Sequence, residues 1–150
     1  PAVEFLAQKK PGEVFSITLG KVVDPASRQV TFEDAQVKEV FRDEAGVPTA
    51  AVLLTENITV LIFAERGPVT SKEVLAEYGL NLDDYQILVV KQGYLTPELY
   101  SVAKKFIMAL TPGNCAQKLT LAEYKNVRRP MEPLEPVTDP KRITEAYDRI

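Results

Sequence analysis

Histidine is missing from this chain, and its absence excludes more than any other feature of the composition. Without an imidazole, the chain cannot assemble a Ser-His-Asp or Cys-His catalytic triad. It also lacks the ligand that nearly every catalytic zinc site uses. Proton transfer near neutral pH would fall to a perturbed carboxylate, lysine, tyrosine or cysteine. The sequence therefore argues against an enzyme that works alone.

Cysteine, long apolar runs and excess charge are scarce as well. Cys115 is the only cysteine, so no internal disulfide can form, which fits a reducing compartment and predicts a cytoplasmic location. No apolar run approaches the roughly 20 residues of a membrane span. The net charge of -3 offers no basic face for nucleic acid. We therefore expect neither a membrane nor nucleic acid among the partners.

The residues that are present predict one folded domain of the α+β class. The 150 residues are 45% hydrophobic and 26% charged, which is typical of a globular protein with a core of its own. We predict a mixed β-sheet of about five to six strands with a central hairpin, accompanied by three to four helices. Within the single domain 1–150, residues 1–11 form a lead-in, residues 128–138 a proline-rich strap and residues 139–150 a terminal helix.

Apolar, β-branched runs mark the expected strands. They lie at residues 13–20, 30–42, 50–55, 58–64, 86–90 and 107–111. Only Glu56-Asn57 separates the third run from the fourth, which predicts the hairpin. In the fourth run both alternating sets are apolar, so we expect that strand to be covered on both faces. Ala35, Val37 and Phe41 share one phase of the second run, and Val40 falls out of it, which indicates a bulge or two-sided burial.

Capping signals mark the expected helices. Residues 1–9 form a short first helix, and Thr70 with Glu73 makes a capping box for the next, which Gly79 would end. Thr96-Pro97 opens a further helix, with apolar residues at helical spacing: Leu99, Val102, Ala103 and Phe106. A short helix follows the capping-box candidate Thr120.

The bend after residues 86–90 is the first candidate site. Lys91, Gln92 and Gly93 lie between a predicted strand and a predicted helix start. A helix N-terminus offers free N–H groups to an anion, Gly93 allows close backbone approach, and Lys91 adds charge. The functional interpretation is a subsite for an anion or carboxylate. The alternative is an ordinary connection whose cap is satisfied internally.

Paired charges are the remaining candidates. Arg128 and Arg129 on the strap could bind a carboxylate bidentately, or pair with surface acids and hold the strap in place. Three acidic pairs could hold Mg²⁺ or Ca²⁺ or simply solvate loops: Glu33-Asp34, Asp43-Glu44 and Asp83-Asp84. Cys115 has no imidazole to activate it and is expected to pack beneath a turn. We identify no catalytic residue and no metal ligand.

The order of motifs in the second half resembles the C-terminal domain of the MlrC-like proteins, named after the microcystin-degradation protein. In that family a strand ending in Val-Lys precedes a helix, a Pro-Gly turn follows, and an Arg-Pro-x-x-Pro-Leu strap closes the domain. The matching elements here are Val90-Lys91, Thr111-Pro112-Gly113 and Arg129-Pro130-Met131-Glu132-Pro133-Leu134. The resemblance covers roughly residues 12–136.

The resemblance implies an accessory role in a zinc metallopeptidase. The zinc ligands belong to the family's larger N-terminal domain, so none is carried over to this chain and zinc is expected only there. The chain would pack against that domain or subunit, wall its cleft or mediate assembly, with a homo-oligomer also possible. The residues expected to face the cleft are Lys91, Gln92, Gly93, Tyr94 and Arg129.

One departure from the family pattern bears on the substrate. Many members carry a His-Phe-Arg-like segment after the Val-Lys strand, where this chain has Tyr94-Leu95-Thr96. If that segment contacts the substrate in the family, we expect the substrate here to differ or the protein not to be a peptidase. The competing hypothesis is a self-sufficient, non-catalytic module that binds a small anionic ligand or self-associates. A large exposed apolar patch would favour the accessory domain, because it would mark an interdomain face.

Overall fold

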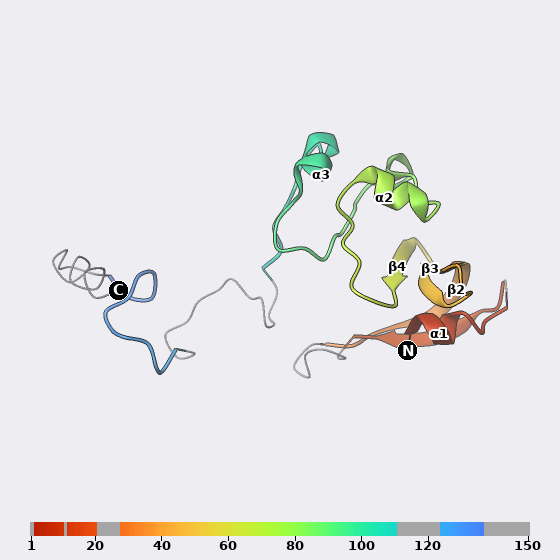
Figure 1. The fold of residues 1–150 in the computed structure, drawn as a ribbon, viewed down its shortest axis with the longest axis horizontal. Coiled ribbons are helices and arrows are strands. Elements are labelled where there is room, and N and C mark those ends of the chain that lie inside the picture. The colour runs from red at the N-terminus through yellow and green to blue at the C-terminus, as the bar shows by residue number, and fades with distance from the viewer. Residues whose placement is uncertain (1, 11, 21–27, 111–123, 137–150) are drawn as a thin grey trace. The chain divides into compact units, whose positions relative to one another are not determined.

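The computed structural model describes residues 2–10, 12–20, 28–110 and 124–136 (Figure 1). The chain divides into two units, residues 1–108 and residues 109–150, and each is described by itself. Among the described residues, the helices and strands all lie in the first unit: α1 (Ala2–Leu6), β1 (Phe15–Leu19), β2 (Val30–Arg42), β3 (Pro48–Thr55), β4 (Ile58–Phe63), α2 (Lys72–Glu77), the 3₁₀ turn η1 (Leu82–Asp84) and α3 (Pro97–Val102). The α+β class is confirmed.

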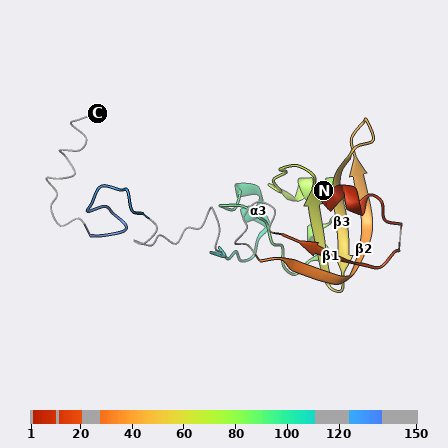
Figure 2. The same ribbon diagram turned by 90° about the horizontal axis from the view of Figure 1, so that it is seen from below.

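The four strands form one antiparallel sheet in the order β1-β2-β3-β4 (Figure 2). The predicted hairpin is present, and β3 pairs with β4 in unbroken register from Thr55 opposite Ile58 to Ala50 opposite Phe63. Glu56 in the two-residue connection has a φ of 42°. That left-handed value is the backbone conformation such tight hairpin turns require.

The sheet is covered on both faces, and β3 lies at its centre with four consecutive residues, 50–53, fully buried. On one face, Val3 and Leu6 of α1 pack with Ala51 and Leu53. On the other, Val52 packs with Leu75 of α2 and with Leu80. Figure 1 shows α1 and α2 on opposite sides of the sheet. The prediction that β4 is covered on both faces is confirmed, because Val60 contacts the first cluster and Leu61 the second.

A β-bulge in β2 explains the phase change around Val40. The register shifts between Val37, which lies opposite Leu53, and Glu39, which lies opposite Val52. The residue between them therefore has no partner on β3, and the alternation restarts one position later. Val40 joins the α1 face and Phe41 the α2 face. The predicted bulge is confirmed. Because of the bulge, Phe41 and Val37 lie on opposite faces of the sheet, so the prediction that they share one phase is wrong.

Helix α2 begins one residue later than predicted. Ser71, rather than Thr70, is the N-cap, and its side chain accepts a hydrogen bond from the Val74 N–H. At the other end Gly79 has a φ of 64°, and its N–H bonds the Ala76 carbonyl while the Leu80 N–H bonds the Leu75 carbonyl. This pair of bonds is a Schellman motif, which satisfies the last carbonyls of the helix and confirms Gly79 as its stop.

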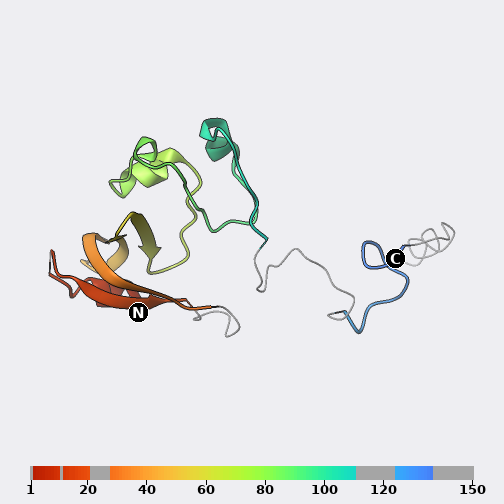
Figure 3. The same cartoon turned by 180° about the vertical axis from the view of Figure 1, so that it is seen from behind.

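Two predicted strands are absent, so the described chain has four strands rather than five or six, and the sheet is antiparallel rather than mixed. Residues 86–90 and 107–110 are neither strands nor buried: Ile87 and Ile107 are each 80% exposed. Their apolar character predicted burial, but no strand of the described chain lies beside them. In Figure 3, α3 and the segments on either side of it extend away from the sheet.

Three short helices and η1 account for the helical content that the structure describes. Helix α3 ends at Val102, so Phe106 lies beyond it, 52% exposed and in edge contact with Tyr100 at a ring-centroid distance of 5.4 Å. Of its expected inward residues, only Leu99 is buried. The helices predicted after Thr120 and over residues 139–150 lie outside the described residues, as does Cys115.

Candidate functional site

The bend at residues 91–96 is fastened to the segment just before α2. The Gln92 side chain donates from Nε2 to the Val69 carbonyl, and the Thr96 hydroxyl donates to the Thr70 carbonyl. These bonds join residues 23 and 26 positions apart in the sequence. The bend is therefore held at both of its ends and is positioned by the covering layer of the sheet.

Gln92 has a second amide atom with no partner. Its Oε1 is buried and accepts no hydrogen bond within the part of the chain that the structure describes. Turning the amide over would aim this oxygen at the Val69 carbonyl and lose the bond from Nε2, so the observed orientation is the favourable one. A buried acceptor left without a donor costs free energy. A donor from outside the described residues would therefore be stabilising at this position.

Lys91, Gly93 and Tyr94 are the exposed members of the bend. Tyr94 is 73% exposed. A Cβ added to Gly93 would meet nothing within 4 Å, so neither the fold nor a tight approach inside the chain requires glycine there. The Lys91 ammonium offers three hydrogen-bond donors, and the Tyr94 hydroxyl can both donate and accept. A group that binds to the exposed side of the bend could use these contacts.

The N-terminus of α3 adds little positive charge to the bend. Thr96 is the N-cap and Pro97 occupies the first turn, as predicted, but Thr96 makes no side-chain cap because its hydroxyl bonds the Thr70 carbonyl. The helix has only six residues, and its dipole is correspondingly small. Charge for an anion at this position would come from Lys91, and the anion subsite stays a prediction.

Arg129 lies in the second unit and closes a loop of the strap on itself. Its guanidinium donates from Nη1 to Glu135 Oε1 at 2.6 Å and from Nη2 to the Tyr124 carbonyl at 2.9 Å. The Glu135 N–H bonds the Met131 carbonyl at 2.9 Å, which completes the turn. Two interpretations of the paired arginines were open. Arg129 follows the second of them: it pairs with an acid and holds the strap in place. Its prediction as a cleft-facing residue is untested.

Among the acidic pairs, Asp43 has a described role in a turn. Asp43 Oδ1 accepts hydrogen bonds from the N–H groups of Ala45 and Val47, at 3.0 and 2.8 Å, and so shapes the connection from β2 to β3. Among residues 2–10, 12–20, 28–110 and 124–136, no three potential ligands of the His, Cys, Asp or Glu type lie together.

Within the described part of the chain, two carboxyl groups have a lowered pKa, and both lie at helix ends or turns. Hydrogen bonding by the Ser71 hydroxyl and by its own N–H lowers the pKa of Glu73 in the first turn of α2. Hydrogen bonds from the Lys9 ammonium and the Lys10 N–H lower the pKa of Glu13. Glu73 is exposed and Glu13 partly exposed, and the lowered pKa keeps both groups ionised near neutral pH. Neither is a candidate for proton transfer at that pH.

Sequence reasoning missed the two ties that position the bend. Gln92 was expected at a ligand cleft, and Thr96 was expected only as a cap. Their acceptors are main-chain carbonyls of Val69 and Thr70, which any residue type provides, so the sequence carries no signal for the pairing. The acidic turn at Asp43 had a signal, because aspartate commonly accepts bonds from the backbone two residues ahead.

Comparison with known proteins identifies the family. The profile described as the MlrC C-terminus matches residues 1–126, which confirms the resemblance and extends it to the start of the chain. The strap at 129–134 lies beyond the match. No curated protein and no solved structure matches. No helix in the described chain is long and apolar enough to span a bilayer. The chain belongs to the MlrC C-terminus family.

Proposed function

We propose that this chain is the non-catalytic C-terminal domain of an MlrC-like, zinc-dependent hydrolase. It docks against a preceding domain that holds the metal, and it walls one side of the cleft. The observation that supports the proposal is the exposed apolar surface around α3, where Val89 is 87% exposed and Ile87 and Ile107 are each 80% exposed. Side chains of this kind rarely face water together unless another surface covers them.

The bend beside this surface supplies the proposed cleft contacts. Lys91 would meet an anionic group, Tyr94 would contribute its hydroxyl, and Gln92 Oε1 would accept the donor that it lacks. Gly93 leaves open space for the docked group. Arg129, already paired with Glu135, would hold the turn of its own strap. All of these roles are positioning and charge contact, and none breaks a bond.

Metal content and hydrolysis distinguish this proposal from a self-sufficient binding module. The two samples are the 150-residue chain and the longest protein that its gene encodes. We expect zinc and peptide hydrolysis in the longer form alone. Stoichiometric zinc in the short chain would overturn the proposal, and no zinc in either form would favour the binding module.

A matched pair of lysine variants tests the cleft. In the active longer form, Lys91→Met removes one charge-assisted hydrogen bond, and about 1.5–3 kcal/mol corresponds to a loss in kcat/KM of about 10- to 150-fold. Lys72→Met is the control, because Lys72 is also an exposed lysine but lies in the first turn of α2. If both substitutions lowered kcat/KM equally, the prediction that Lys91 faces the cleft would be wrong.

A further inference from the structure

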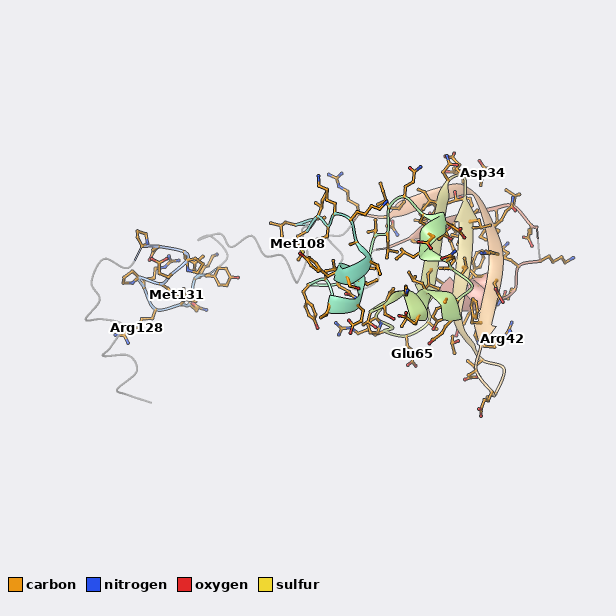
Figure 4. All side chains as sticks on the ribbon, turned by 90° about the horizontal axis from the view of Figure 1, so that it is seen from above. Asp34, Arg42, Glu65, Met108, Arg128 and Met131 are labelled. Atoms are coloured by element: carbon orange, nitrogen blue, oxygen red, sulfur yellow. The ribbon has the colours of Figure 1, made fainter. Side chains whose placement is uncertain are left out.

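Exposed apolar side chains in the described residues gather in one short stretch of sequence. Sixteen large apolar or aromatic side chains are exposed, and ten of them lie between residues 87 and 110. The ten are Ile87, Leu88, Val89, Tyr94, Tyr100, Val102, Phe106, Ile107, Met108 and Leu110. Every residue from 101 to 110 is exposed. Figure 4 shows Met108 near the end of this stretch, away from the strands of the sheet.

On either side of α3, the backbone of two runs in this stretch, residues 86–90 and 106–110, makes almost no main-chain hydrogen bonds. No N–H of residues 86–90 or 106–110 donates to a carbonyl of the described chain, and of their carbonyls only that of Val90 accepts, from the Gln92 N–H. Main-chain groups that leave water must find partners in a helix, a sheet or a turn. These two apolar runs therefore have unpaired main-chain groups that a neighbouring strand could pair, but no such strand lies in the described chain.

The pattern of the runs indicates which kind of sheet would take them. Ile87-Leu88-Val89-Val90 and Phe106-Ile107-Met108 are continuous apolar runs rather than alternating ones. Continuous runs are typical of parallel strands, which helices cover on both faces. The connection between them, residues 91–105, contains α3 and exceeds the dozen residues that a parallel crossover needs.

The antiparallel sheet of this chain is not the acceptor. Residues 92 and 96 are already bonded to Val69 and Thr70, immediately before α2. With these bonds made, Ile87 and Val89 remain 80% and 87% exposed, so the first run lies away from β4.

We propose that residues 86–110 form a β-α-β unit whose two strands extend a parallel sheet in the domain that precedes this chain. The inference rests on the proposed function, since it requires that preceding domain. It specifies the interface as two added strands joined by main-chain hydrogen bonds. In this arrangement the bend at residues 91–96 lies at the carboxyl end of the first added strand, where ligands commonly bind in parallel sheets.

Site-specific photo-crosslinking in the longest protein that the gene encodes tests the proposal. Val89 and Ile107 are replaced, one at a time, by a benzophenone amino acid, and the crosslinked peptides are identified by mass spectrometry. Val47 in the β2–β3 connection, which is 54% exposed, is the matched control. We expect crosslinks from positions 89 and 107 to residues that precede this chain, and none from position 47. Crosslinks to β4, or to a second copy of the chain, would overturn the proposal.

Hydrogen exchange of the unsubstituted long protein gives an independent test that does not depend on a variant folding. We expect the amides of residues 86–90 and 106–110 to exchange more than about 100-fold slower than unprotected amides, as in paired strands. If the preceding domain binds zinc and the 86–110 amides exchange without protection, the proposed function stands and this inference fails. If the long protein binds no zinc, both fail.

Discussion

Replacing Leu53 by alanine, and separately its neighbour Leu54, measures how much the central strand contributes to stability. The two leucines are adjacent on β3, so the change in intrinsic strand preference is the same for both. Their side chains point to opposite faces. Leu53 is fully buried against the α1 cluster, whereas Leu54 is 38% exposed.

The expected difference follows from burial. A leucine-to-alanine change removes three carbon atoms, which at about 0.8 kcal/mol per buried methylene is about 2.4 kcal/mol. At Leu53 the rigid neighbours Ala35 and Ala51 cannot fill the space, so a cavity raises the loss to about 3–4 kcal/mol. At Leu54 about three-fifths of the side chain is buried and water reaches the rest, so the loss is about 1.5 kcal/mol.

Urea unfolding followed by far-ultraviolet circular dichroism measures both losses in the 150-residue chain, which has no tryptophan to report by fluorescence. We expect the midpoint to fall at least twice as far for Leu53→Ala as for Leu54→Ala, with similar slopes. Equal losses, or a greater loss at Leu54, would refute the assignment of the α1 face as a packed core.

Three further predictions concern single positions. Gly79→Ala forces a side chain onto a φ of 64° and costs about 1–2 kcal/mol, whereas Gly93→Ala stays within about 0.5 kcal/mol; urea midpoints that move equally would contradict this contrast. Glu56→Asn relieves the left-handed φ of 42° and raises the free energy of unfolding by about 0.5–1 kcal/mol, and a lower melting temperature would count against it. Because a hydrogen bond from Lys9 lowers the pKa of Glu13, the stabilising contribution is present above the unfolded-state pKa and is lost as the pH falls through the folded-state pKa. Lys9→Met should return the Glu13 pKa towards its usual value in an NMR titration, and an unchanged titration would exclude Lys9 as the cause.

Local signals were sufficient for much of the sheet. The hairpin was predictable because two residues separate two apolar runs, and the stop of α2 because glycine tolerates the left-handed conformation at Gly79. The position of Val40 outside the alternating phase of its strand indicated the bulge. The predicted N-cap is one residue too early because Thr70 and Ser71 are both suitable caps, and only the structure shows that the Ser71 side chain accepts the bond from the Val74 N–H.

The two missing strands show where sequence reasoning stops. The apolar character of residues 86–90 and 107–111 correctly indicates a preference for burial, but a strand also needs a neighbouring strand, and the pattern does not say in which part of the protein it lies. The candidate site was limited in the same way. The exposure of Lys91 and Tyr94 could be expected, because lysine and tyrosine in a bend usually face water. The bond from Gln92 to the Val69 carbonyl joins two segments that are distant in the sequence, and neither segment contains a pattern that predicts it.

The bulge in β2 also makes one residue of a central strand dispensable. Val37 and Glu39 face consecutive partners on β3, so deleting Lys38 would leave every other pairing and every buried side chain of β2 in place. The deletion would cost one long bond, from Lys38 Nζ to the Gly79 carbonyl at 3.3 Å. Strands covered on both faces seldom tolerate a change of length, because a shift by one residue exchanges their faces. Relatives of this chain can therefore differ by one residue in the middle of β2 and keep the same two cores.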